Sequence, residues 1–255
     1  MAEVGGVQSV DRAAAALEFL AAQKVAGVSE VAAALGVHIS TASRMLAALA
    51  GRGLVESIGG VRGRYRLGPG ILRLAATMTG TLDLPERSAD VCAELAERLG
   101  ETVNVAVRNG LVAINVQQHD GGAVLTANSW VGRPTPLHAT SSGKVLLAHA
   151  PEDVRARSLV DLTTYTAATI TDPAALRAQL TETERAGFAV TVGELEDGLN
   201  ALAVPIRDHR GVVVAALSVS GPAARMPADG LPQLVDALAT AAAAIGRRLG
   251  NVETV

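Results

Sequence analysis

Residues 29–57, SEVAAALGVHISTASRMLAALAGRGLVES, decide the fold of the N-terminal part of this 255-residue chain. Two runs in it carry apolar residues at helical spacing, and each begins after a serine, Ser29 or Ser40, that can cap a helix. Gly36 lies between the runs, where a glycine that ends a helix is expected. The stretch therefore predicts a helix-turn-helix. We expect its two helices over 30–35 and 41–52.

The segments that flank this stretch complete a winged helix. Upstream, Ser9 followed by apolar residues at helical spacing predicts a helix over 9–23. Downstream, residues 54–58 and 64–67 alternate between apolar and polar side chains, as two strands joined by a glycine-rich loop do. Together these elements form a winged helix-turn-helix domain, which we place at residues 1–68.

The second helix of the motif presents a polar face that suits DNA. Met45, Leu46 and Leu49 occupy its core positions, so the polar side chains near its start face outward. An outward arginine can bind guanine through two acceptors, whereas hydroxyls and a helix N-terminus suit phosphates. The same residues could instead be only helix caps and a solvated face. The candidates for DNA contact are His38, Ser40, Thr41, Ser43 and Arg44.

The N-terminal domain is basic although the chain carries a net charge of −3. Residues 1–68 hold seven of the 22 Lys and Arg but only five of the 25 Asp and Glu, which leaves 15 against 20 for the rest. This excess suits the phosphates of double-stranded DNA. Arg64 and Arg66 alternate on the return strand of the wing, so one of them could serve an internal salt bridge instead. The candidates for phosphate contact are Arg12, Arg62 and Arg64.

The rest of the chain mixes helical and strand patterns. A linker over 69–83, opened by Gly-Pro, precedes a second domain at 84–255. Asn109-Gly110 is the strongest two-residue signal for a β-hairpin. Helices and hairpin-joined strands in this order indicate an α+β domain built on an antiparallel sheet. We expect strands over 102–108, 111–117, 123–130, 188–192, 201–207 and 212–218, and helices over 70–79, 86–99, 142–149, 151–159, 172–186 and 231–249.

Composition excludes several classes of protein. Two Phe, two Tyr and one Trp are too few for stacking along single-stranded nucleic acid. The longest apolar runs fall short of the roughly 20 residues that cross a bilayer, and Met1–Val10 lacks the basic start of a signal peptide. We therefore expect a cytoplasmic protein with no membrane partner. The single cysteine, Cys92, excludes an internal disulfide and is expected to be a buried small hydrophobe.

No catalytic or metal-binding set can be assembled from the spacing. The five histidines are scattered, and an exposed loop explains His119 beside Asp120 more simply than half a metal site does. Glu194, Glu196 and Asp197 form an acidic segment, which we interpret as a solvated loop or a segment that gates a ligand. We expect no enzyme and no cofactor. The alternatives are an enzyme tethered to DNA by its first domain and a protein-interaction module.

Separate motifs, in order along essentially the whole chain, resemble the IclR-type transcriptional regulators. The resemblance implies a GAF-like ligand-binding domain behind the winged helix, assembled as a homodimer or homotetramer. It also implies control of a catabolic operon by a small carboxylic or aromatic metabolite, most simply as a repressor, with an effector-requiring activator as the alternative. The motifs are VQSVDRAAAALEFL (7–20), GVHISTASRMLAALAGRGLVE (36–56), GRYRLGPGILRLA (63–75), GETVNVAVRNG (100–110), PLHATSSGKVLLA (136–148), TITDPAALRAQL (169–180) and AVPIRDHRGVVVAALSVSGPAARM (203–226).

The resemblance further implies an effector pocket lined by short segments of the second domain. The residues themselves suit an oxygen-bearing ligand, because alternate serines of one strand point to the same side and a serine pair at a helix start suits an anion. From the residues alone, the hydroxyls of Ser218 and Ser220 could instead simply satisfy neighbouring backbone groups. The full phosphate-loop pattern is absent, since His138 stands where it needs glycine. Ala201 and Thr191 stand where relatives that bind small oxo-acids have a thiol and a carboxylate, which argues against the same effector. The expected pocket residues are Ser141, Ser142, Leu199, Ala201, Ser218 and Ser220.

Overall fold

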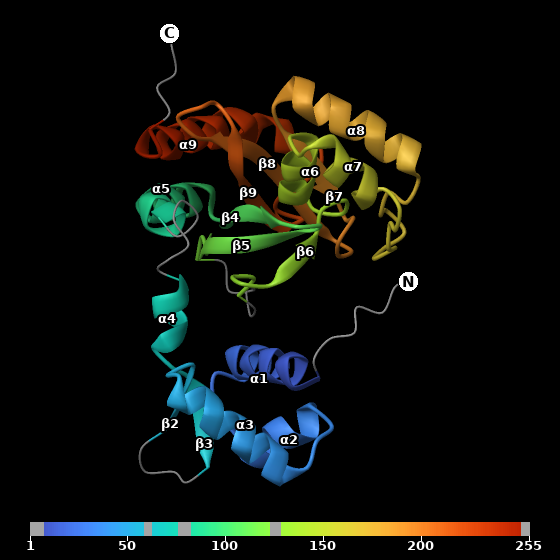
Figure 1. Ribbon diagram of the computed structural model, residues 1–255. Helices are drawn as coiled ribbons and strands as arrows, with labels where there is room; N and C mark the ends of the chain where they lie inside the picture. The colour runs from blue at the N-terminus through green and yellow to red at the C-terminus, as the bar shows by residue number, and fades with distance from the viewer. Residues whose placement is uncertain (1–7, 59–62, 76–82, 123–128, 251–255) are drawn as a thin grey trace. The chain divides into compact units, whose positions relative to one another are not determined.

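The computed structural model describes residues 8–58, 63–75, 83–122 and 129–250. Within it the chain divides into two compact units, residues 1–82 and 83–255. Figure 1 shows a helical unit with a small sheet and a larger unit built around a wide sheet. The first unit contains the expected winged helix and the second the expected α+β architecture, which confirms the predicted fold class.

Helices α1, α2 and α3 and a small antiparallel sheet make up the described part of the winged helix. Its core consists of the apolar residues that helical spacing placed on one face, and Leu20 and Leu46 are fully buried there. The sheet has the order β1-β3-β2, and its short strand β1 was not expected from the sequence. The bounds are α1 Gln8–Gln23, β1 Ala26–Gly27, α2 Val28–Ala34, α3 Ile39–Gly51, β2 Val55–Ser57, β3 Arg64–Leu67 and, after the wing, α4 Gly70–Ala75.

The two predicted serine caps are wrong, because each helix begins earlier than its serine. Helix α2 starts at Val28, and the backbone N–H of Gly27 donates to the Glu30 carboxylate at 2.5 Å. Helix α3 is capped by His38, whose Nδ1 accepts from the backbone N–H of Ser40 at 3.3 Å. An imidazole nitrogen thus does what a serine oxygen does at other helix starts. The cap also fixes the position of a predicted DNA contact.

A six-stranded antiparallel sheet with the order β6-β5-β4-β9-β8-β7 forms the centre of the second unit. The Asn109-Gly110 turn joins β4 and β5, as expected, with Gly110 at φ +61°. Strand β6 was not expected, while most of the strand expected over 123–130 lies outside the described residues. The bounds are β4 Thr102–Asn109, β5 Val112–His119, β6 Pro134–Pro136, β7 Ala189–Val192, β8 Leu199–Arg207 and β9 Val213–Pro222.

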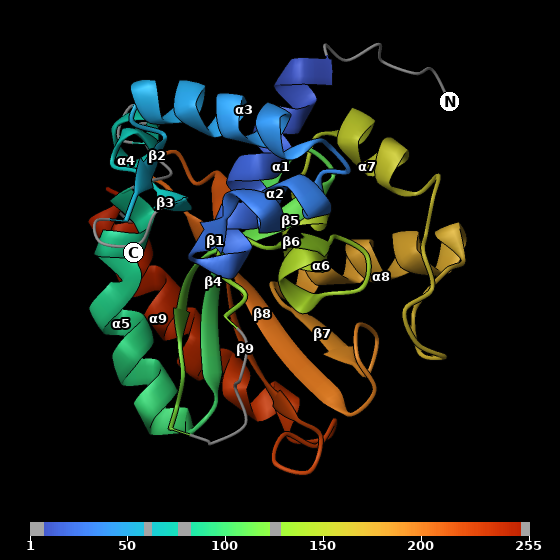
Figure 2. The ribbon, with the colours of Figure 1, turned by 90° about the horizontal axis from the view of Figure 1, so that it is seen from below.

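Alternation along the strands gives the sheet two different faces. One face presents large residues such as Val105 and Leu217, which pack against α5 and α9. The other presents alanines, including Ala106 and Ala216, beneath α6. Figure 2 shows α5 and α9 along one side of the strands and α6 and α8 toward the other. The helices are α5 Asp83–Leu99, α6 Ser141–Ala148, α7 Glu152–Ser158, α8 Pro173–Ala186 and α9 Val235–Arg248, the last after a 3₁₀ turn at Leu231–Leu234.

Helix α6 lies close to the chain that precedes it because Gly143 carries no side chain. A Cβ at this position would lie 2.6 Å from the Leu137 Cα, far inside contact distance.

Cys92 is fully buried in the α5 core, as predicted, and burial raises the pKa of its thiol to about 12. Among the described residues no single helix is long and apolar enough to cross a membrane, and the pair α2 and α3 reaches that length only across a 109° bend.

Candidate functional site

A cavity of about 70 Å³ lies in the second unit, between the alanine-bearing face of the sheet and the start of α6. By the same measure one water molecule needs about 10–15 Å³, so the space suits a ligand of roughly five to seven non-hydrogen atoms. The structure brings all the expected pocket residues to its wall. They are Ser141, Ser142, Leu199, Ala201, Ser218 and Ser220.

Pairing between strands places the polar groups of the sheet side by side in the cavity wall. Ser220 on β9 is opposite Ala201 on β8, which is opposite Thr191 on β7. Two residues along β9, Ser218 is opposite Asn104 on β4. Directly opposite residues in an antiparallel pair have Cβ atoms about 4.5–5.5 Å apart and share one face. The sheet therefore offers a patch of hydroxyl and amide groups with fixed spacing.

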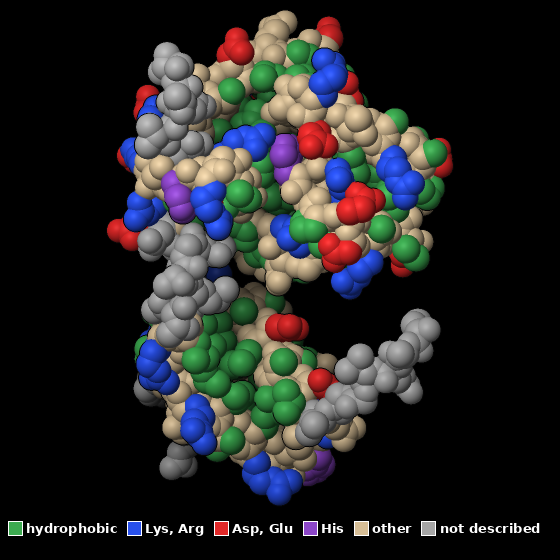
Figure 3. All heavy atoms as spheres, turned by 45° about the horizontal axis from the view of Figure 1, so that its top comes forward, with side chains coloured by type: hydrophobic (Ala, Val, Ile, Leu, Met, Phe, Trp, Pro, Cys, Tyr) green, Lys and Arg blue, Asp and Glu red, His purple; other side chains and the backbone are tan. Residues whose placement is uncertain are grey.

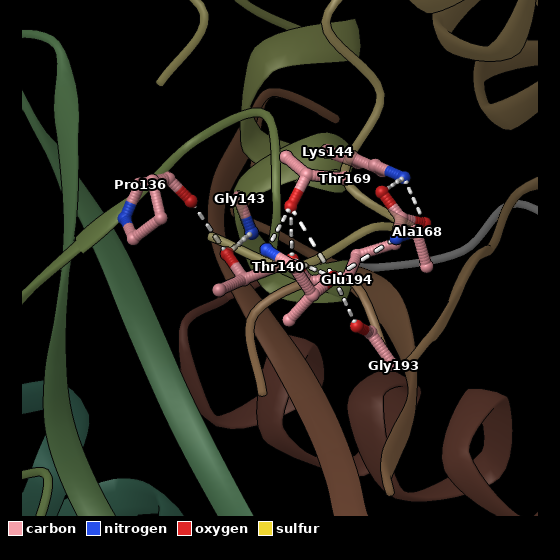
Figure 4. Close-up of polar contacts among 9 residues, drawn as sticks. Pro136, Thr140, Gly143, Lys144, Ala168, Thr169, Gly193 and Glu194 are labelled. Atoms are coloured by element: carbon pink, nitrogen blue, oxygen red, sulfur yellow. Dashed lines mark hydrogen bonds and ion pairs between the residues drawn. The ribbon is translucent and has the colours of Figure 1, made fainter. Parts of the chain in front are cut away.

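The N-terminus of α6 supplies a second group of donors. Thr140 caps the helix, since its hydroxyl accepts from the backbone N–H of Gly143 at 3.1 Å and donates to the Pro136 carbonyl at 2.8 Å (Figure 4). No described residue accepts from the backbone N–H of Ser141 or Ser142. Helix N-termini carry a partial positive charge and unsatisfied N–H groups, so this end of the cavity favours an anion.

The cavity wall is uncharged in the described part of the chain. It includes neither a basic nor an acidic side chain. A second negative charge on a ligand would therefore have no partner, and burying an unpaired charge is costly. The arrangement suits a ligand with one carboxylate, held by neutral donors at the start of α6. Within the described ranges, no group of three or more His, Cys, Asp or Glu could hold a metal ion.

A buried ion pair supports one side of the cavity from behind. The Lys144 Nζ on α6 donates to both carboxylate oxygens of Glu194, each at 2.6 Å (Figure 4). The Lys144 side chain is 0% exposed and that of Glu194 is 7% exposed. Burial lowers the pKa of Lys144, and the carboxylate opposes that effect. The interpretation of Glu194 as part of a solvated loop was wrong, although Glu196 and Asp197 are exposed as expected.

Two threonine hydroxyls hold the backbone beside this pair. Thr169 donates to the Glu194 carbonyl at 2.7 Å, and Thr166 donates to the Gly193 carbonyl at 2.6 Å. The segment that they fix carries Leu195 and leads into Leu199, which both line the cavity. The ion pair and these two hydrogen bonds therefore fix the position of one cavity wall relative to α6.

The candidate DNA contacts lie on the surface of the winged helix. His38, Ser40, Ser43 and Arg44 are exposed around the start of α3, and Thr41 is half-buried. Figure 3 shows basic side chains and a histidine at the surface of this unit. Arg12 on α1 is half-buried, and Arg62 lies outside the described residues.

Both arginines of the return strand take part in ion pairs. The Arg66 Nε lies 2.6 Å from the Glu56 carboxylate on the opposite strand. The Arg64 Nη2 lies 3.7 Å from the Glu30 carboxylate and its side chain is 43% exposed. The Arg64 pair is the longer of the two, but the Arg66 side chain is the more exposed at 57%, so both charges remain open to a phosphate.

Comparison with known proteins decides the family. Residues 9–59 match the model of the IclR helix-turn-helix domain, and residues 76–247 match that of the bacterial transcriptional regulator IclR C-terminal domain. The chain belongs to the IclR family. IclR proteins are transcriptional regulators and not enzymes, which confirms the predicted class and removes the tethered-enzyme alternative.

Individual members of the IclR family match over nearly the full chain. The chain is 34% identical to HTH-type transcriptional regulator BhcR of Paracoccus denitrificans, over 93% of this chain and 86% of that protein. It is 34% identical to the glycerol operon regulatory protein of Streptomyces griseus, over 96% and 97%. The solved structure of an IclR homolog from Microbacterium hydrocarbonoxydans, complexed with 4-hydroxybenzoate, superimposes with a TM-score of 0.82 at 29% identity, over 95% of this chain and 99% of that one.

Sequence reasoning missed several wall residues of this IclR-family cavity. Asn104 and Asn115 each lie between apolar neighbours in the runs Val103–Val107 and Val112–Val116, and a polar residue inside such a run is a usable signal. Trp130 could not be placed without the three-dimensional path of the chain. Thr191, which the resemblance had placed beside Ala201, is in the wall, and the wall residues that were not expected there are Asn104, Asn115, Trp130, Thr135, Ala139, Thr140 and Leu195.

Proposed function

We propose that this IclR-family regulator is a cytoplasmic repressor of a catabolic operon and that a small monocarboxylic acid controls its hold on DNA. The observation that carries the proposal is the uncharged cavity in which serine hydroxyls face the free N–H groups of a helix start. Relatives named for a glycerol operon and for repression support the class of target. The relative complexed with 4-hydroxybenzoate supports an organic acid as effector.

DNA recognition rests on α3 in the major groove. Arg44, exposed near the start of the helix, reads a base edge, while His38 and Ser40 meet the backbone around it. Arg12, Arg62 and Arg64 contact phosphates and raise affinity without carrying sequence information. Thr41 and Ser43 complete the polar face. A homodimer or homotetramer places two such helices on half-sites about 34–36 Å apart.

The effector lies across the cavity with its carboxylate at the start of α6. The N–H groups and hydroxyls of Ser141 and Ser142 hold the anion, and Ser218 and Ser220 hold oxygens at the other end. Leu199 and Ala201 provide the apolar part of the wall. The volume of about 70 Å³ favours an acid of three or four carbons over a larger one.

Gel mobility of a labelled fragment from the upstream region of the protein's own gene tests the DNA-binding part. Arg44→Ala is expected to raise the Kd about 5- to 150-fold, because a bidentate base contact contributes about 1–3 kcal/mol. Affinity should fall steeply as salt rises. The control is Arg177→Ala, an exposed arginine of α8, which should leave the Kd unchanged.

Operator binding by the wild-type protein, with and without added acid, distinguishes a repressor from an effector-requiring activator. Specific binding that an added acid weakens is the result expected of a repressor. Binding that needs the added acid would identify an effector-requiring activator instead. Absence of specific binding at every salt and acid concentration would contradict the proposed function.

A further inference from the structure

A larger cleft opens at the end of α6, whereas the cavity described above lies at the start of this helix. The volume of the cleft is about 510 Å³, and pockets for small organic molecules typically measure roughly 300–1,000 Å³. Its walls come from the end of α6, the end of β4 and the start of β9. Arg108 and His149 are the polar residues of the described wall, and the others are apolar. A mostly apolar wall with a few polar groups is typical of a ligand site.

The cleft exists because β4 and β9 separate at this end of the sheet. Their ladder stops at the pair Ala106–Ala216, although β4 continues to Asn109 and β9 begins at Val213. Strand β9 remains paired with β8 as far as the pair Arg207–Val213, where the register shifts at a bulge. A bulge bends a strand and increases its twist. The end of β4 is therefore left without its neighbour, and the space between the two strands is open.

Alternation along the two strands points Arg108 and Val214 into this cleft. Ala106 and Ala216 pack beneath α6, and residues two positions further along a strand face the same way. Arg108 is two residues after Ala106, and Val214 is two residues before Ala216. Both side chains therefore lie on the α6 side of the sheet. The last turn of α6 faces them across the cleft.

Arg108 is the wall residue that can pair with a charged ligand. Its Nη1 donates to the Gly110 carbonyl at 3.1 Å, a surface hydrogen bond within its own hairpin. No described carboxylate lies within ion-pair distance of Arg108, so its Nε and Nη2 donors remain for a ligand. His149 is already bonded, because its Nδ1 lies 3.0 Å from the Val145 carbonyl and its Nε2 lies 3.3 Å from the Arg207 Nη2. A guanidinium can bind one carboxylate through two parallel hydrogen bonds.

The apolar part of the wall determines what else the ligand carries. Val212 is 49% exposed and Val214 is half-buried, so a ligand that covers them removes apolar surface from water. A bare inorganic anion would leave these valines in water, and a neutral apolar molecule would leave Arg108 without an anion. A dicarboxylate would bring a second charge that no described wall residue pairs. The wall therefore suits a molecule that is apolar along its length and anionic at one end.

We propose that this cleft is a second ligand site, which binds an apolar monocarboxylate too large for the cavity at the start of α6. Arg108 binds the carboxylate, and Leu146 and the valines contact the apolar body. The site does not depend on the proposed effector, because the cleft and the cavity share no described wall residue. Helix α6 contacts both ligands, one through Ser141 and Ser142 at its start and the other through Leu146 near its end.

Three compounds with the same apolar chain and different end groups test the second site by titration calorimetry. Octanoate carries a carboxylate, octanamide a neutral amide and octylamine a cation. The wild-type protein should bind octanoate about tenfold or more tighter than the other two, because only the carboxylate pairs with Arg108. Octanamide or octylamine binding as tightly as octanoate, or no binding of octanoate, would overturn the inference.

Variants show where the octanoate binds. Arg108→Gln should raise the Kd of octanoate about tenfold or more and leave that of octanamide unchanged. The matched control is Arg98→Gln, an exposed arginine of α5, which should change neither Kd. The double variant Ser141→Ala with Ser142→Ala should also bind octanoate as the wild type does. Loss of octanoate binding in the serine variant, with normal binding in Arg108→Gln, would place the acid in the cavity at the start of α6 and contradict the inference.

Methyl NMR of the wild-type protein locates the ligand without any variant. Saturating octanoate should shift the methyl signals of Val212 and Val214, which line the cleft. The signals of Val160, which is 84% exposed and outside the described wall, should stay in place. This measurement keeps the inference testable if Arg108→Gln does not fold. Unshifted Val212 and Val214 signals while octanoate is bound would refute the second site.

Discussion

At the scale of single residues, the Lys144–Glu194 pair joins α6 to the segment beside the cavity. Both charges are almost completely buried, and each is the only described ion-pair partner of the other. Such a pair is costly to desolvate and costlier to break, because one partner alone would be an unpaired buried charge. The pair therefore specifies the position of the segment more than it adds to stability.

Replacing one partner should destabilise the protein strongly. Lys144→Met leaves the Glu194 carboxylate buried without a cation, so the free energy of unfolding in urea should fall by about 3–5 kcal/mol. Adding Glu194→Leu to Lys144→Met should recover most of the loss, because no buried charge then remains. Additive losses in this double-mutant cycle, followed by circular dichroism, would show that the two residues act independently.

Residue-scale prediction from the sequence succeeded where spacing fixes direction. Ser218 and Ser220 are two residues apart in a strand, so their common face follows from the chain alone. Lys144 and Glu194 are 50 residues apart, and no local pattern connects them. The cap of α3 was missed for another reason. His38 caps the helix in place of the expected Ser40, and histidine is a rarer cap than serine, so the sequence favoured the serine.

At the scale of elements, helices α5 and α9 are joined at their surface by an ion pair. The Arg248 Nη2 on α9 donates to the Asp90 carboxylate on α5 at 2.8 Å. This hydrogen bond to Arg248 lowers the pKa of Asp90 from 3.8 to about 2. A lowered carboxyl pKa stabilises the folded state above pH 3.8, and the contribution is lost as the pH falls toward 2.

The titration of Asp90 measures that contact directly. Carboxyl carbon NMR of the wild type should give an Asp90 pKa near 2, and Arg248→Ala should return it toward 3.8. Arg247→Ala, the neighbouring basic residue at the end of α9, is the matched control and should leave the pKa of Asp90 low. An ordinary Asp90 pKa in the wild type would show that the helices are not tied in this way.

Most elements were visible in the sequence, but their neighbours were not. Glycine and proline signals located α8 between Asp172 and Gly187, with an αL glycine at its end. The sheet order β6-β5-β4-β9-β8-β7 depends on β4 pairing with β9, whose residues are more than 100 positions apart. The two-residue β1 and three-residue β6 are too short for a period to be recognised.

At the scale of the whole molecule, regulation requires that the cavity and the DNA surface influence one another. If a monocarboxylic acid of three or four carbons is the effector, a saturating concentration of it should change the operator Kd about 5- to 150-fold. Operator DNA should change the affinity for that acid by the same factor, because such coupling is reciprocal. Quenching of Trp130, the single tryptophan and a wall residue, reports acid binding.

The double variant Ser141→Ala with Ser142→Ala provides the control for this coupling. It should bind operator DNA as the wild type does, since the winged helix is untouched, but its operator Kd should no longer respond to the acid. An operator Kd that is the same with and without bound acid would show that the cavity does not regulate DNA binding.

The row of opposite residues Thr191, Ala201 and Ser220 also has an evolutionary consequence. Each side chain in this row stands on a strand whose backbone is held by its neighbours, so an exchange at one position alters the wall without altering the path of the chain. Ligand preference can therefore diverge between gene copies through single codon changes at such positions. Regulators that share this sheet can therefore come to respond to new metabolites while they still bind the same operator.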